Sequence, residues 1–250
     1  MFMLKFSKTY DNHIFTKYQL KPVVEDSFQV THNAFCVADG VTRDNIYGEA
    51  VVYPETKEEV EYWMKTYPNP SGADMASKIC TNQFIQYISN IEEHAINQNK
   101  LFEIAKQVNQ DIWEINQKRK IDYLKEDYYC TEAVGGVIIG ETLYAFSIGD
   151  CHIALLDENM EIKDETINNH KQFEDYLSKV HCKENKYDWN NNQDRAMVRR
   201  EFRNRPDKKY QGKEISFGAL SGQKEAEHYI DTYEFPLKRN SIYLCLLGWM

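Results

Sequence analysis

Three acidic residues near the start of the chain have the types and spacing that could bind a metal ion. Glu25 and Asp26 are adjacent, and Asp39 ends the apolar run in AFCVADGVT, residues 34–42. Hard divalent cations such as Mg²⁺ and Mn²⁺ take oxygen ligands from carboxylates and backbone carbonyls. Gly40 has no side chain, so its carbonyl could approach such an ion closely. An Asp-Gly pair is also a common plain turn, and both interpretations stay open at this stage.

A fourth acidic candidate lies in the middle of the chain. Asp150 follows Gly149 between two apolar runs, LYAFSI at 143–148 and CHIALL at 151–156. A Gly-Asp pair in that position is typical of a hairpin turn, which is the more frequent role of such a pair. Arginines at 199–205 could bind a phosphate, but a solvated helix face is the commoner explanation of such a cluster.

A nucleophilic aspartate at a strand end is a rival interpretation of Asp39. Haloacid-dehalogenase-type phosphatases need a second aspartate two positions after the nucleophile. Val41 occupies that position here, and no alternating strand–helix pattern follows it. A metal-binding Asp39 therefore agrees better with the sequence.

The elements that position these carboxylates are predicted from hydrophobic periodicity. SFQVT at 27–31 alternates polar and apolar residues, and a two-residue turn separates it from the apolar run 34–38, which predicts a hairpin. Ser71 precedes a helical pattern as its N-cap. Helices are predicted at 57–64, 73–88, 99–118, 171–180 and 194–202. Strands are predicted at 132–140, 143–148 and 151–156 as an antiparallel meander, then at 160–163, 229–237 and 241–247.

The order of these elements bounds the fold class. Strands and helices come in blocks, which indicates an α+β fold rather than alternating βαβ units. No linker-like stretch divides the 250 residues, so we expect one domain spanning residues 1–250.

Composition argues against several classes of protein. The formal net charge of −9 argues against a nucleic-acid-binding protein dominated by phosphate contacts. The N-terminus lacks the apolar region of a signal peptide, and no run reaches the roughly 20 apolar residues of a membrane span. The six cysteines form no CxxC pair, so a thiolate zinc site is not expected. We therefore expect a cytoplasmic protein with no membrane or nucleic-acid partner.

The chain resembles a known family over almost its whole length. That family is the metal-dependent, type 2C (PPM) serine/threonine protein phosphatases, in a bacterial-type variant. The segments that carry the resemblance follow the order of the family's motifs: VVEDSF at 23–28, AFCVADGVT at 34–42, YPNPSGADMAS at 67–77, CTEAVGGVIIG at 130–140, LYAFSIGDCHIALL at 143–156 and FGALSGQKEAEHYI at 217–230.

The resemblance implies a fold and a reaction. The fold is a four-layer αββα sandwich, with two antiparallel sheets packed face to face and flanked by antiparallel helices. The reaction is hydrolysis of phosphoserine or phosphothreonine by a water that two Mn²⁺ or Mg²⁺ ions activate. The partner would be a phosphorylated protein, such as the substrate of a serine/threonine kinase, and we expect a monomer.

The resemblance also implies roles for individual residues. Asp39 would bridge both metal ions, and the Gly40 carbonyl would bind one of them. Glu25 and Asp26 would act mainly through metal-bound waters. Asp150 would support a third, weaker metal. Lys21 stands where the family usually has an arginine that holds the substrate phosphate, and a lysine supplies only a point charge there.

The chain departs from the family's pattern at the end of its sequence. Leu247 occupies the position of a metal-binding aspartate, and a further helix and closing strand are expected after Met250. We therefore expect a C-terminally incomplete domain that lacks the last strand. An alternative function is a catalytically impaired phosphatase-like domain that binds a phosphoprotein or a regulatory partner. A truncated copy with no function of its own is a third reading.

Overall fold

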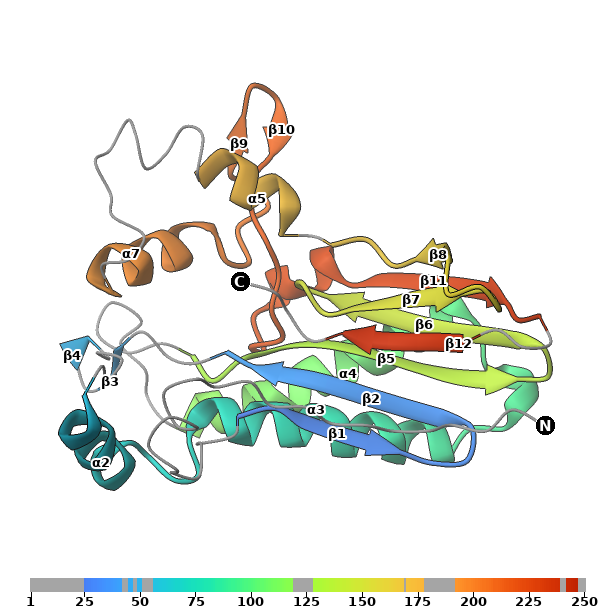
Figure 1. Ribbon diagram of the computed structural model, residues 1–250, viewed down its shortest axis with the longest axis horizontal. Coiled ribbons are helices and arrows are strands. Elements are labelled where there is room, and N and C mark those ends of the chain that lie inside the picture. Colours follow the sequence, from blue (N-terminus) through green and yellow to red (C-terminus); the bar gives the residue numbers. More distant parts are fainter. Residues whose placement is uncertain are drawn as a thin grey trace.

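The computed structural model places two main sheets and a pair of long helices in a layered domain (Figure 1). Lys21 and Leu247, two positions that the sequence analysis singled out, lie outside the described residues. The structure describes residues 25–41, 45–46, 49–50, 56–118, 128–168, 170–177, 192–238 and 242–246.

The larger sheet has five strands and is antiparallel throughout. Its order is β1-β2-β5-β6-β11, and β1 and β2 form the predicted hairpin. Thr31 closes that hairpin, because its backbone N–H donates to the carbonyl of Ala34 at 2.7 Å. The strands of this sheet are β1 (Ser27–Val30), β2 (Ala34–Gly40), β5 (Thr131–Ile139), β6 (Thr142–Ile148) and β11 (Asp231–Pro236).

The smaller sheet has three strands, and it corrects the predicted meander. β6 and β7 are not paired, because the chain leaves the larger sheet at Ile148 and enters the smaller one at His152. Gly149 makes this crossing with a φ of +81°, and the distant strand β11 takes the place beside β6. The strands of the smaller sheet are β12 (Ile242–Leu246), β7 (His152–Leu156) and β8 (Ile162–Glu165).

Two helices cover one face of the five-stranded sheet (Figure 1). They are α3 (Gly72–Ser89) and α4 (Gln98–Lys118), which match the two longest predicted helices. Ser71 is the N-cap of α3, as predicted, and its hydroxyl accepts the Asp74 N–H at 3.1 Å.

Two apolar cores hold the layers together. Phe84 of α3, Ile112 of α4 and Phe146 of β6 belong to the core between the helices and the larger sheet. The second core lies between the two sheets and includes Phe35, Leu143, Ile153 and Phe235. The described residues therefore form helix, sheet and sheet layers, a mixed fold of antiparallel sheets and helices.

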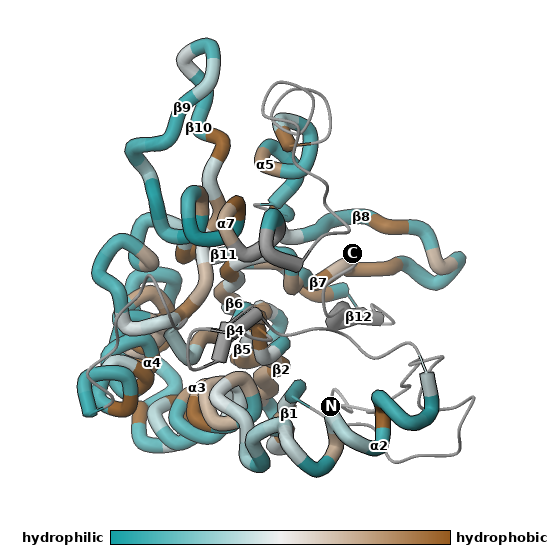
Figure 2. The backbone as a smooth tube through the Cα atoms, turned by 90° about the vertical axis from the view of Figure 1, so that its left-hand side faces the viewer, coloured by the Kyte–Doolittle hydropathy of each residue, from teal (hydrophilic) through white to brown (hydrophobic). Residues whose placement is uncertain are grey.

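The remaining elements gather mainly at one end of the sandwich. Figure 1 shows α2, β3, β4 and α7 beyond the end of β2, and Figure 2 shows mostly hydrophilic residues along β9 and β10. Within the described part of the chain, no helix is both long and apolar enough to cross a membrane. These elements are β3 (Asn45–Ile46), β4 (Glu49–Ala50), α2 (Lys57–Thr66), η1 (Glu93–Ala95), α5 (Lys171–Tyr176), α7 (Asn192–Phe202), β9 (Lys209–Tyr210), β10 (Lys213–Glu214) and η3 (Lys224–Tyr229).

Candidate metal centre

The pairing of β2 with β5 brings two carboxylates together at one end of the larger sheet. Asp39, near the end of β2, is the cross-strand partner of Glu132, near the start of β5. Side chains of directly opposite residues point to the same face, with Cβ atoms about 5 Å apart. Thr131 ties the two strand ends, because its hydroxyl donates to the Asp39 carbonyl at 2.6 Å.

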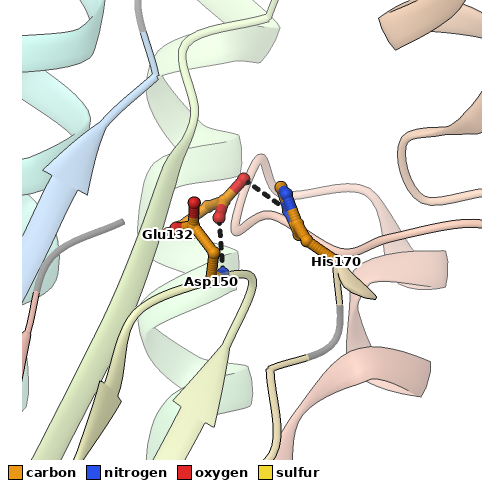
Figure 3. A group of neighbouring side chains, drawn as sticks. All are labelled: Glu132, Asp150 and His170. Atoms are coloured by element: carbon orange, nitrogen blue, oxygen red, sulfur yellow. Dashed lines mark hydrogen bonds and ion pairs between the residues drawn. The ribbon is translucent and has the colours of Figure 1, made fainter. Parts of the chain in front are cut away.

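Asp150 and His170 join Glu132 from two other segments (Figure 3). Asp150 lies in the crossing between β6 and β7, and its backbone N–H donates to Glu132 Oε2 at 2.8 Å. His170 directly precedes α5, and its Nε2 lies 3.1 Å from Glu132 Oε1. One ligand atom from each of the three side chains lies within 4.8 Å of the others, and all three residues are buried.

The carboxylates at this end of the sheet destabilise one another's charge. Burial raises the pKa of Asp39 to about 7, and the carboxylates of Asp26, Glu132 and Glu25 add to the rise. Burial and the nearby Glu132 also raise the pKa of Asp150 well above its usual range. Burial alone would raise the pKa of Glu132 too, but His170 and hydrogen bonds from the side chain and amide of Asp150 lower it instead. A divalent cation would relieve this repulsion, so the donor set fits one.

Glu25 is held by hydroxyl groups. Tyr67 donates its hydroxyl to Glu25 Oε1 at 2.8 Å, and the Ser71 hydroxyl donates to the same oxygen. The Ser77 hydroxyl donates to the Glu25 carbonyl, so both ends of the residue are fixed to α3 or its lead-in. Gly40 lies directly against this segment, because a Cβ at Gly40 would overlap the carbonyl oxygen of Glu25.

The structure places the acidic residues chosen from the sequence in one region. Glu25 and Asp26 lie close enough to Asp39 to raise its pKa, and Asp39 does the same to Asp150. Asp39 and Asp26 are partly exposed, whereas Glu25, Gly40 and Asp150 are buried. The roles predicted for these residues as ligands stay predictions.

Sequence reasoning missed two members of the cluster. Glu132 is the only charged residue in the strand sequence TEAVGGVII, and that isolation was the available signal. His170 carries no comparable signal, because it lies in a polar stretch after β8 and reaches Glu132 only through the fold.

Comparison of the whole chain with known proteins gives matches at the level of structure alone. No protein-family model matches the sequence, and no curated protein does. The crystal structure of the Mycobacterium tuberculosis serine/threonine phosphatase PstP/Ppp is similar, with a TM-score of 0.51 and 14% identity over 89% of this chain and 71% of that one. A structure of the catalytic domain of the phosphatase PstP in complex with two manganese ions gives a TM-score of 0.52 and 13% identity, over 89% and 70% of the two chains.

These similarities agree with the element order and with the antiparallel sheets described above. At this level of identity they establish the architecture, and the site must be argued from its own residues. The chain has the fold of the bacterial-type PPM serine/threonine phosphatases.

Proposed function

We propose that this chain is a metal-dependent phosphatase that hydrolyses phosphoserine or phosphothreonine in a phosphorylated protein. One observation carries the proposal. In a fold shared with serine/threonine phosphatases, Asp39, Glu132 and Asp150 converge at one end of the sheet from three separate segments. Carboxylates so close together are costly without a cation, and divalent cations are the usual partners of such a group.

Several residues would hold the metal ions, which we expect to be Mn²⁺ or Mg²⁺. Asp39, the Gly40 carbonyl and Asp26 would hold two ions, with Glu25 acting in support, and Asp150 would hold a third, weaker one. Such ions, when bound, act as Lewis acids toward a phosphoryl oxygen and generate a nucleophile from water at neutral pH. The hydroxyls of Tyr67 and Ser71 orient Glu25.

Positive charge near these carboxylates would bind the substrate phosphate. Lys21 stays our prediction for this role from the sequence. Arg199 of α7 is a further source, because its charge acts on Asp39 and partly offsets the rise in the pKa of that carboxyl. A phosphoprotein made by a serine/threonine kinase would supply the anionic group.

The test is Mn²⁺-stimulated hydrolysis of a phosphoserine or phosphothreonine peptide. We expect Asp39→Asn to lower kcat/KM on the order of 100-fold or more, the scale seen when the support of a metal site is lost. Asp164→Asn is the matched control, because this carboxylate lies on the exposed strand β8 and should leave the rate unchanged. If the unmodified chain hydrolyses no faster than Asp39→Asn, the proposed reaction is wrong.

A second candidate function is a phosphatase-like domain that binds a phosphoprotein or regulatory partner without hydrolysing it. The observation in its favour is β12, whose last residue Leu246 is the cross-strand partner of His152, close to Asp150. The described strand contains no carboxylate, and Leu247 follows it in the sequence. Calorimetry with Mn²⁺ separates the two functions. Tight binding of two ions favours the enzyme, and weak or no binding favours the second candidate.

The finer features of the fold belong to the same proposal. Ala154 and Leu156 lie on the face of β7 opposite the core between the sheets, and both are nevertheless buried. This burial supports a covering layer on that face and hence the four-layer sandwich. A single monomeric, cytoplasmic domain spanning residues 1–250 is still what we expect from the sequence. Analytical ultracentrifugation tests the monomer.

A further inference from the structure

His170 is a buried polar side chain whose ring nitrogens are not satisfied. It is 4% exposed, and its ring packs against Phe217, with ring centroids 4.4 Å apart, and edge-on to Phe173. Among the described residues, neither ring nitrogen has a hydrogen-bond partner of good geometry. Nε2 nevertheless points at Glu132, 3.1 Å from Oε1 (Figure 3). Burying an imidazole whose nitrogens lack hydrogen-bond partners lowers the stability of the fold, unless a ligand such as a metal ion binds those nitrogens.

The Glu132 carboxylate, which faces His170, is held in place by the backbone. A Cβ on Gly149 would overlap the Glu132 carboxylate. The Glu132 carboxylate therefore lies directly over the crossing between β6 and β7. The Asp150 backbone N–H donates to Glu132 Oε2 at 2.8 Å, and the backbone N–H of His170 donates to Asn168 Oδ1 at 2.8 Å. A strand, a turn and a loop therefore bring together three buried residues. Glu132 is 5% exposed, Asp150 is 7% exposed and His170 is 4% exposed.

The donor set selects a class of metal ion. Glu132, Asp150 and His170 offer two carboxylate oxygens and one imidazole nitrogen, with the ligand atoms within 4.8 Å of one another. Mg²⁺ and Ca²⁺ prefer oxygen ligands alone, whereas Zn²⁺ and neighbouring transition metals bind imidazole well. Zn²⁺ takes nitrogen and oxygen ligands at about 2.0–2.2 Å, so a small contraction of this cluster would suit it.

We propose that Glu132, Asp150 and His170 form a binding site for a divalent transition-metal ion that prefers an imidazole ligand, with Zn²⁺ as its representative. This site is separate from the pair of ions proposed at Asp39, although it shares Asp150 with the proposed function. The proposed zinc site does not depend on phosphatase activity, because it is argued only from the identity, burial and spacing of the three ligands in the structure. The competing explanation is a structural ion pair between protonated His170 and Glu132, with no metal.

The test uses the full chain, stripped of metal, and titrates it with Zn²⁺ by calorimetry. We expect one Zn²⁺ to bind, and we expect His170→Gln to weaken that binding on the order of 100-fold or more, because a direct ligand is lost. Glu132→Gln should weaken it as well. Asp164→Asn is the matched control, since this carboxylate lies on the exposed strand β8 and its loss should leave this Zn²⁺ affinity unchanged.

Each outcome of this titration either supports or overturns the proposed zinc site. Zn²⁺ binding that is equal in His170→Gln and the unmodified chain overturns the proposal, as does an equal loss of binding in His170→Gln and Asp164→Asn. A chain that binds Zn²⁺ here but fails to hydrolyse phosphopeptide supports this site and overturns only the proposed function.

A measurement on the unmodified chain covers the case in which the variants do not fold. Co²⁺ is the probe, because a ligating imidazole gives a paramagnetically shifted ring N–H resonance in the NMR spectrum. The shifted resonance supports the site, provided that excess Mg²⁺ does not remove it. Its absence at saturating Co²⁺ overturns the site.

Discussion

Glu25 and Glu132 are two buried glutamates on either side of Asp39, and their surroundings differ. They are 9% and 5% exposed, and both raise the pKa of Asp39. Neutral hydroxyls from Tyr67 and Ser71 hold the Glu25 carboxylate. The Glu132 carboxylate faces the imidazole of His170 and lies beside a second carboxylate, Asp150.

The difference shows that burial alone does not identify a ligand. Hydroxyl donors satisfy a carboxylate without changing the charge of the group, so the surroundings of Glu25 are those of a structural anchor. A cluster of two carboxylates and an imidazole has a charge that depends on what is bound to it. Glu132 is therefore the glutamate whose surroundings respond to a cation or a proton.

The largest expected effect comes from the glycine on the Glu25 side. Gly40→Ala would push a Cβ into the carbonyl oxygens of Glu25 and Ala73, which are backbone atoms and cannot rotate away. We expect it to lower the free energy of unfolding by about 4 kcal/mol, measured by urea denaturation.

Gly140→Ala is the control for this substitution, because nothing lies within 4 Å of a Cβ there. Gly140 has a φ of +60°, so Gly140→Ala should lower the free energy of unfolding only by the cost of placing alanine in a left-handed conformation, about 1–2 kcal/mol. Equal losses in the two variants would mean that the close approach of Gly40 to Glu25 is not real.

A smaller effect should appear on the Glu132 side, in metal-free protein. Glu132→Gln and His170→Gln each remove one member of a buried pair whose side chains lie 3.1 Å apart, and each should cost about 3 kcal/mol of unfolding free energy. The double variant should cost less than the sum by about 1–3 kcal/mol, because the partners contact each other. Thermal or urea unfolding of all four proteins gives this coupling. Strictly additive losses would show that His170 and Glu132 do not interact.

The smallest effect should come from Glu25→Gln, which removes the charge and keeps an oxygen acceptor for the two hydroxyls. We expect a loss below about 1 kcal/mol, similar to the roughly 1 kcal/mol of one hydrogen bond lost in Tyr67→Phe. Urea denaturation of both variants is the measurement. A loss as large as that of Glu132→Gln would remove the contrast between the two glutamates.

Local patterns in the sequence predicted much of the fold. The alternation in 27–31 and the apolar run at 34–38 predicted β1, β2 and their pairing, and the periodicity of 73–88 and 99–118 predicted α3 and α4. These features depend on neighbours a few positions apart, which a sequence shows directly.

The parts that escaped prediction depend on contacts between distant positions. The crossing from β6 to β7 looks like an ordinary hairpin until β11, more than 80 residues later, is seen beside β6. The same limit applies to the metal centre, because His170 is 38 positions from Glu132 (170 − 132) and only the packing of the α5 segment brings them together. Asp39 and Asp150 were found because they follow apolar runs, a local signal.

Cys151 directly follows Asp150 and is completely buried. Burial, with the neighbouring carboxylates, raises the pKa of its thiol well above the ordinary value. Since the thiolate is the reactive form, an alkylating reagent can modify Cys151 only in molecules whose β6–β7 crossing has opened. Alkylation of the Cys151 thiol therefore measures local opening of the fold beside the metal centre. The rate at which Cys151 is labelled reports how often the metal centre opens. An ion that binds at the centre and stabilises it should lower this labelling rate.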